Sequence, residues 1–134
     1  MWVKDAFILG HADYQFQHEE ILFGYKPGSG RLGRGGARWY GDNAQSSVFS
    51  VARPRSAHEH PTMKPPELVE GAVLNSSPRR ALVLDPFAGS GSTLVACERT
   101  GRRARLLELD PCYCDVIVER FERLTGRQAK RVPA

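Results

Sequence analysis

Two glycines one residue apart stand where a ligand could approach the backbone. They belong to the stretch "DPFAGSGSTL" over 85–94, which follows the apolar run "ALVL" and leads into an expected helix. Glycine has no side chain to exclude a ligand, and the first N–H groups of a helix have no partner within it. The stretch is therefore typical of a turn that holds a small ligand at the carboxyl end of a strand. A Gly-x-Gly pattern alone is also common in tight turns.

Two carboxylates narrow the choice of ligand. Asp85 ends the first expected strand, where it would repel a pyrophosphate but could receive an ammonium group. Glu108 follows Gly91 by seventeen residues and ends the next expected strand, where a carboxylate can accept the hydroxyls of a ribose. No lysine follows the glycines as in a P-loop, and Leu94 stands where a dinucleotide fingerprint has a third small residue. These residues favour a ligand with a ribose and a positively charged end, such as S-adenosylmethionine.

The elements that would position these residues alternate between strand and helix. Residues 79–85 form a short, almost continuous apolar run, which predicts a strand covered on both faces. A helix is expected over 92–100, closed by Gly101, and a second strand over 103–109. A strand–helix–strand segment of this length predicts two adjacent parallel strands in a right-handed βαβ unit.

Two further helices are predicted beside this unit. Pro65 and Pro66 suit the first turn of a helix with an apolar side. Asp110 can cap the last helix, with Pro111 at its first position and Gly126 at its end. The second half of the chain is therefore expected to be regular throughout.

The first half of the chain has another composition. Residues 1–26 alternate aromatic and polar positions, which predicts two strands. Residues 27–57 are rich in glycine and arginine and are expected to form a long basic loop. We treat 58–126 as the cofactor-binding region and 127–134 as a tail of one domain.

Bulk properties set the class of protein. The chain has 134 residues, the size of one domain, and a formal charge of +4, which mildly supports an anionic partner such as nucleic acid. No apolar run approaches the roughly 18 residues of a membrane span, and the first residues lack the layout of a signal peptide, so we expect a cytoplasmic protein. Cys97, Cys112 and Cys114 form no disulfide framework and have no zinc-like spacing with the histidines, so we expect reduced, structural cysteines and no metal site.

The motifs together resemble one enzyme family. "DPFAGSGST" with "LELDPCYCDVIVERFERLTG", preceded by "HPTMKPPELVEGAV", resembles the DNA amino-methyltransferases that modify adenine N6 or cytosine N4. The resemblance is strong over about 58–126 and looser over the opening "WVKDAFILGHADYQFQHEEILFGYK". It implies a partial Rossmann-like methyltransferase fold of the α/β class, with a parallel βαβ core and an additional N-terminal strand pair. It also implies S-adenosylmethionine as cofactor and site-specific DNA methylation, as in restriction–modification systems.

The resemblance also assigns the cofactor site. Glu108 would hold the ribose, with Leu109 and Asp110 near the adenine. The segment before the first helix would close over the cofactor, with Lys64 or Thr62 near its carboxylate. The expected cofactor-binding residues are therefore Asp85, Pro86, Phe87, Ala88, Gly89, Ser90, Gly91, Ser92, Thr93, Glu108, Leu109, Asp110, His60, Pro61, Thr62 and Lys64.

Target recognition in such enzymes often lies where this chain has residues 27–57. Arginines there could reach phosphates of double-stranded DNA, and Trp39 or Tyr40 could pack against the duplex or a displaced base. The expected DNA-binding residues are Arg31, Arg34, Arg38 and Trp39. A solvated basic loop without a partner is the alternative.

The catalytic motif of the family is missing from these residues. Methylating an exocyclic amine requires an acceptor for the NH₂ group and aromatic walls around the extruded base, which the family supplies as Asp/Asn/Ser-Pro-Pro-aromatic. The single Pro-Pro pair, Pro65–Pro66, lies between Lys64 and Glu67 and cannot be that motif. No catalytic residue is therefore assigned, and by the family's order the motif would precede residue 1.

Three explanations follow. We favour the carboxyl-terminal part of a split, truncated or misannotated gene. The others are a subunit that pairs with a second polypeptide supplying the motif, and a non-catalytic remnant that binds cofactor or DNA. Outside this family reading, the alternatives are a DNA-binding module without chemistry and a methyltransferase acting on RNA or small molecules.

Overall fold

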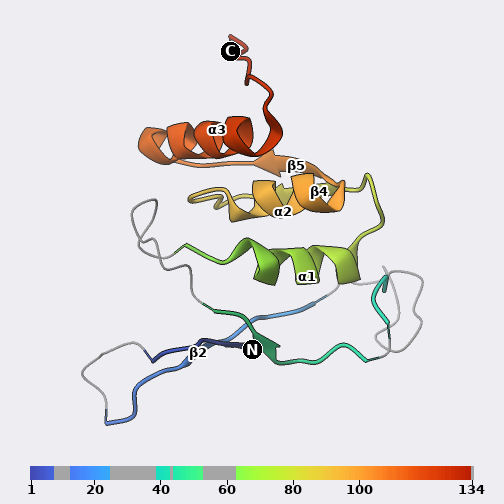
Figure 1. Ribbon diagram of the computed structural model, residues 1–134, viewed down its shortest axis with the longest axis vertical. Helices are drawn as coiled ribbons and strands as arrows, with labels where there is room; N and C mark the ends of the chain where they lie inside the picture. The colour runs from blue at the N-terminus through green and yellow to red at the C-terminus, as the bar shows by residue number, and fades with distance from the viewer. Residues whose placement is uncertain (8–12, 25–38, 43, 53–62, 134) are drawn as a thin grey trace.

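The described residues form short strands at the start of the chain and a more regular α/β unit after it. The computed structural model describes residues 1–7, 13–24, 39–42, 44–52 and 63–133. Figure 1 shows β4, α2, β5 and α3 on one side of α1, and the N-terminal strands on the other. The elements in chain order are β1 (Trp2–Val3), β2 (His18–Glu19), β3 (Phe49–Ser50), α1 (Pro66–Ser76), β4 (Leu82–Asp85), α2 (Ser92–Thr100), β5 (Arg103–Leu106) and α3 (Pro111–Thr125).

The two strands of the α/β unit are parallel and joined by α2. The register pairs Leu82 with Arg103 and Asp85 with Leu106, which confirms the predicted βαβ core. Backbone pairing continues beyond both strands, since the Leu107 N–H donates to the Asp85 carbonyl and the Ala88 N–H donates to the Leu107 carbonyl, each at 3.0 Å. The glycine turn after β4 and the residues after β5 are therefore held together at one edge of the sheet.

The helix ends follow local chemistry. Asp110 caps α3, where its Oδ1 accepts a hydrogen bond from the Cys112 N–H at 2.8 Å, and Pro111 takes the first helical position. Gly101 and Gly126 end α2 and α3 in the left-handed conformation, with φ of 70° and 68°. Within the described residues, no helix is long and apolar enough to cross a membrane.

The core lies mainly between α1 and α2. Leu68 and Val73 of α1 are buried, as are Val95, Ala96 and Cys97 of α2. Burial raises the pKa of the Cys97 thiol, so this cysteine is a packed apolar group at neutral pH.

One face of the β4–β5 pair is open. Leu82 and Leu84 are 55% and 65% exposed, whereas Val83 between them is half-buried. The expectation of strands covered on both faces is therefore wrong for the described residues. The physical reason is that side chains alternate along a strand, and the described helices cover only the face toward which Val83 points.

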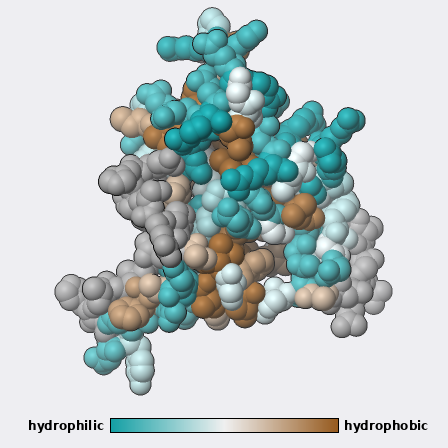
Figure 2. Space-filling view, viewed as in Figure 1, coloured by the Kyte–Doolittle hydropathy of each residue, from teal (hydrophilic) through white to brown (hydrophobic). Residues whose placement is uncertain are grey.

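The N-terminal strands form a separate sheet in the order β2-β1-β3. β1 is antiparallel to β2, so the two strands predicted in this region pair with each other, and it is parallel to β3, which lies inside the segment expected to be a loop. Long-range bonds hold β3, since the Trp2 indole N–H donates to the Val51 carbonyl at 2.7 Å and the Phe49 N–H donates to the Met1 carbonyl at 2.9 Å. Figure 2 shows apolar residues on the surface at the level of these strands.

Two glycines offer a matched test of the packing between the glycine turn and α3. Gly91 and Gly126 both have positive φ, but an added Cβ at Gly91 would lie 3.0 Å from Cγ1 of Ile117, whereas one at Gly126 would meet nothing within 4 Å. We expect Gly126→Ala to lower the free energy of unfolding by about 1 kcal/mol through backbone strain alone. Gly91→Ala should cost about 2 kcal/mol or more, because crowding adds to strain. Urea denaturation measures both, and equal losses would show that the turn can move away from α3.

Candidate functional site

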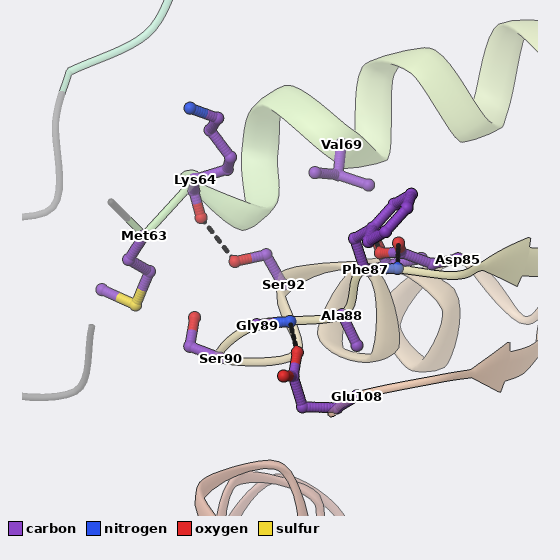
Figure 3. Close-up of a pocket in the computed structure, with 11 residues that line it drawn as sticks. Met63, Lys64, Val69, Asp85, Phe87, Ala88, Gly89, Ser90, Ser92 and Glu108 are labelled. Carbon is purple, nitrogen blue, oxygen red and sulfur yellow. Dashed lines mark hydrogen bonds between the residues drawn. The ribbon is translucent and has the colours of Figure 1, made fainter. Parts of the chain in front are cut away.

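A pocket of 360 Å³ opens at the carboxyl end of β4. It lies between the glycine turn, the start of α1 and Glu108, which follows the end of β5 by two residues (Figure 3). This volume falls within the range of about 300–1,000 Å³ common for small-molecule sites. The lining residues are Met63, Lys64, Val69, Asp85, Phe87, Ala88, Gly89, Ser90, Ser92, Thr93 and Glu108.

The structure brings together most residues that the sequence assigned to the site. Of the assigned residues, Pro86, Gly91, Leu109 and Asp110 do not line this pocket. Met63 and Val69 line it without having been assigned; Val69 belongs to the apolar side of α1, and no local pattern marks Met63. The assigned residues outside the described ranges are His60, Pro61, Thr62, Arg31, Arg34 and Arg38.

Asp85 is held in place by its own turn and by α2. Its Oδ1 accepts a hydrogen bond from the Phe87 N–H at 3.0 Å, and its Oδ2 accepts one from the Thr93 hydroxyl at 2.6 Å. Asp85 is half-buried, while Phe87 beside it is 88% exposed. The carboxylate thus has a fixed position at the pocket wall, and an exposed aromatic ring stands next to it.

Glu108 is oriented by three backbone N–H groups. Its Oε2 accepts from the Gly89 N–H at 2.6 Å, and its Oε1 accepts from the Leu109 and Asp110 N–H groups at 2.9 and 3.0 Å. Hydrogen bonds to an ionised carboxylate are stronger than those between neutral groups. The bond from the Gly89 N–H fastens the glycine turn to the residues after β5 (Figure 3).

The two glycines have different roles. Gly89, with φ of 52°, lines the pocket. Gly91 is buried against Ile117 of α3 and does not line the pocket. The space that the missing side chain of Gly91 leaves is next to Ile117 of α3.

The segment before α1 reaches the pocket through its backbone. The Ser92 hydroxyl donates to the Lys64 carbonyl at 2.6 Å, which ties this segment to the first residue of α2. In Figure 3, the side chain of Lys64 extends away from the glycine turn. Its ammonium instead lies 2.5 Å from Oε2 of Glu19 on β2.

Arg120 of α3 supports the turn from behind and was not assigned from the sequence. Its Nη1 donates to the Ser90 carbonyl at 2.6 Å and to the Ser90 hydroxyl at 3.1 Å, and lies 3.6 Å from Sδ of Met63. One available signal was its position, because Arg120 follows Val116 by one helical turn on the apolar side of α3. A charged residue on that side needs a partner, and the partner is the glycine turn.

Trp39 packs within the protein. Its indole N–H donates to the Asp42 carbonyl at 3.0 Å, and its ring meets that of Phe23 edge-on, with centroids 6.3 Å apart. Tyr40 next to it is 48% exposed. Within the basic loop 27–57, the side chain of Trp39 is therefore engaged by contacts inside the protein.

The charges of the pocket suit a ligand with charged groups of both signs. Asp85 and Glu108 supply two carboxylates, and Lys64 is the one basic residue among the described lining residues. Within the part of the chain that the structure describes, no three His, Cys, Asp or Glu residues are grouped so that they could hold a metal ion. The polar atoms of the site are instead carboxylates, hydroxyls and backbone N–H groups.

Comparison with known proteins identifies the family. Residues 2–119 match the N6/N4 methyltransferase family, described as DNA methylases. The chain belongs to this family. Its parallel βαβ core is accordingly part of the Rossmann-like fold of methyltransferases, as the sequence motifs predicted.

Individual DNA methylases resemble parts of the chain. M2.DpnII, a Type II methyltransferase of Streptococcus pneumoniae, is 39% identical over 66 residues, which cover 49% of this chain and 25% of that protein. TTHA0409, a DNA modification methylase of Thermus thermophilus, is 38% identical with a TM-score of 0.52, over 61% of this chain and 33% of its own. M1.HpyAVI, solved as a complex with SAM, is 25% identical with a TM-score of 0.52, over 62% of this chain and 43% of its own. The chain thus spans a quarter to less than half of the length of these relatives.

Arg120→Met tests the support of the turn. We expect it to lower the free energy of unfolding by about 1.5–3 kcal/mol, because it removes a charged donor from the Ser90 carbonyl. Arg127→Met is the matched control, since Arg127 pairs with Glu98 at 2.8 Å and is 61% exposed, where such pairs contribute less than about 1 kcal/mol. Urea denaturation compares the two variants, and a smaller loss for Arg120→Met than for Arg127→Met would contradict the proposed support.

Proposed function

We propose that this chain is the cofactor-binding part of a DNA methyltransferase. The reaction would transfer a methyl group from S-adenosylmethionine to the exocyclic amine of adenine (N6) or cytosine (N4) in double-stranded DNA. The observation that carries the proposal is the meeting of Asp85, Glu108 and the glycine turn in one pocket at the carboxyl end of β4. When bound there, S-adenosylmethionine supplies an activated methyl group on a sulfonium.

Asp85 would receive the ammonium group of the amino-acid end of the cofactor. Its carboxylate accepts hydrogen bonds from the Thr93 hydroxyl and the Phe87 N–H. The carboxylate is therefore already in position before a cation binds. A fixed negative charge in a half-buried position favours a cationic ligand group over a phosphate. This supports S-adenosylmethionine over a nucleotide with a pyrophosphate.

Glu108 would hold the ribose hydroxyls. Three N–H groups orient its carboxylate, and Gly89 leaves space beside it. We propose that Leu109 and Asp110, which follow Glu108 outside the pocket lining, lie near the adenine. Leu109 is 97% exposed, so a purine ring could pack against it.

The groups that hold the target amine would come from outside residues 1–134. The chain has no Asp/Asn/Ser-Pro-Pro-aromatic sequence, and it spans about a quarter of the length of M2.DpnII. We propose that the missing part belongs to the same methyltransferase, encoded as one gene or as a second polypeptide. A remnant that binds cofactor or DNA without methylating it is the alternative. An assay of methyl transfer to DNA, RNA and small amines, with the preceding coding region included, separates these possibilities and tests the substrate class.

The basic segment would contact DNA. Arg31, Arg34 and Arg38 could reach phosphates, which position a protein on a duplex without reading its sequence. Trp39 would act indirectly, because its ring already packs on Phe23 and its N–H is bonded to Asp42. Tyr40 is 48% exposed, more than the half-buried Trp39 beside it.

Titration calorimetry tests the cofactor site. We expect the chain to bind S-adenosylmethionine, and Glu108→Ala to weaken binding at least about ten-fold, as the loss of hydrogen bonds to a charged group predicts. Glu119→Ala, which removes an exposed acid from α3, is the control and should bind like the parent chain. Thermal unfolding of each variant checks that it folds. No binding at millimolar cofactor, or equal affinities in all three proteins, would refute this assignment.

Fluorescence anisotropy with a labelled duplex tests the DNA contact. We expect log K to fall linearly with log[salt], with a slope of about 0.9 for each phosphate contacted. Replacing Arg31, Arg34 and Arg38 together by Gln should weaken binding and flatten this slope. The control replaces Arg103 and Arg105 by Gln, because these are exposed arginines on β5 and lie outside residues 27–57. Binding that is insensitive to salt, or equal losses in both variants, would argue against the assignment.

A further inference from the structure

Lys64, the basic residue that lines the pocket, forms an ion pair with a residue of the N-terminal sheet. Lys64 stands at the pocket wall, where its carbonyl accepts the Ser92 hydroxyl at 2.6 Å. Its side chain turns away from the glycine turn (Figure 3), and its ammonium lies 2.5 Å from Oε2 of Glu19. Glu19 belongs to β2, 45 residues earlier in the chain, and does not line the pocket.

Glu19 bridges two lysines. Its other oxygen, Oε1, lies 2.6 Å from the ammonium of Lys4, whose side chain is only 1% exposed. Both ammonium groups also stand over the ring of buried Trp2, at 5.2 Å for Lys4 and 5.5 Å for Lys64. A cation over an aromatic face gains further electrostatic stabilisation. The ammonium of Lys64 is therefore held outside the pocket by Glu19 and the Trp2 ring.

The charge of Glu19 persists at neutral pH. Partial burial acts to raise its pKa, but the hydrogen bonds and charges of Lys4 and Lys64 outweigh burial and hold the pKa below its ordinary value of 4.5. Glu19 is thus ionised at neutral pH, beside the one basic residue among the described lining residues of the pocket. A ligand carboxylate entering this pocket would need the same ammonium and would meet the same negative charge.

We infer that Glu19 competes with the ligand carboxylate for Lys64, and so sets how strongly the pocket favours a ligand with a carboxylate over one without. This inference rests on the proposed function for the identity of the ligand. Binding of a carboxylate ligand draws Lys64 from Glu19 toward the pocket, whereas a ligand without the carboxylate leaves the pair in place. Glu19 acts through Lys64 and does not touch the ligand, and the same exchange loosens the tie between β2 and the pocket wall.

The test compares S-adenosylmethionine with decarboxylated S-adenosylmethionine, which keeps the sulfonium and the amine. We expect Glu19→Gln to tighten S-adenosylmethionine binding about two- to five-fold, the range that a partly exposed ion pair of about 0.4–1 kcal/mol predicts, and to leave the decarboxylated ligand unchanged. Glutamine keeps an oxygen that can accept from Lys4. Glu20→Gln is the matched control, because it removes the same charge from the exposed next residue and should alter neither affinity.

Lys64→Met completes the cycle. This substitution should weaken the binding of S-adenosylmethionine but not that of the decarboxylated ligand. In the Lys64→Met background, Glu19→Gln should have no further effect, because no ammonium remains for Glu19 and the ligand to share. If Glu19→Gln fails to fold, Lys4→Met combined with Glu19→Gln removes the buried cation with its partner and carries the same expectation. Unchanged or weaker S-adenosylmethionine binding in the folded variant, or equal changes for both ligands, overturns the inference. If the parent chain binds neither ligand, the proposed function itself fails.

Discussion

The hydrogen bond from the Gly89 N–H to the Glu108 carboxylate joins the two strands of the α/β unit at the point where a ligand would lie. It can form because β4 and β5 are parallel, so that both strands end at the same edge, and because backbone pairing continues past them through Asp85, Leu107 and Ala88. A carboxylate that accepts three N–H groups is strongly oriented, and the turn that supplies one of those groups is oriented with it. The position of Asp85 relative to Glu108 follows from this joint.

A turn built from glycines is adaptable by itself, and the surrounding elements supply its rigidity. Arg120 holds the Ser90 carbonyl from behind, and Ile117 packs where Gly91 has no side chain. Ser92, the first residue of α2, binds the segment before α1. Arg120 and Ile117 do not line the pocket, so α3 orders the site without occupying the space for a ligand.

Two further features lie next to the site: the ion pair of Lys64 with Glu19, and the open face of the β4–β5 pair. Lys64 and Glu19 link the pocket wall to the N-terminal sheet, whose strand β3 lies within residues 27–57. On the α/β unit, the open face of the β4–β5 pair carries exposed Leu82 and Leu84 beside exposed Arg103 and Arg105 among the described residues. The matching part of this chain makes up 25% of M2.DpnII and 43% of M1.HpyAVI.

Much of this architecture is determined locally by the sequence. Capping by Asp110, the left-handed ends at Gly101 and Gly126, and the short apolar run that forms β4 depend on neighbouring residues, so the βαβ unit could be predicted. Nine of the residues that line the pocket were also among those assigned from the sequence. Local pattern could not reveal β3, which depends on bonds to Trp2 and Met1 nearly fifty residues away. Nor could it reveal that Gly91 serves packing with Ile117, that Arg120 supports the turn, or that Lys64 is bound to Glu19. The sequence by itself determined which residues could bind a cofactor, because helix and turn chemistry act over a few residues. Only the tertiary structure decided which of them face the pocket and which hold it in place, because those contacts join segments that are distant along the chain.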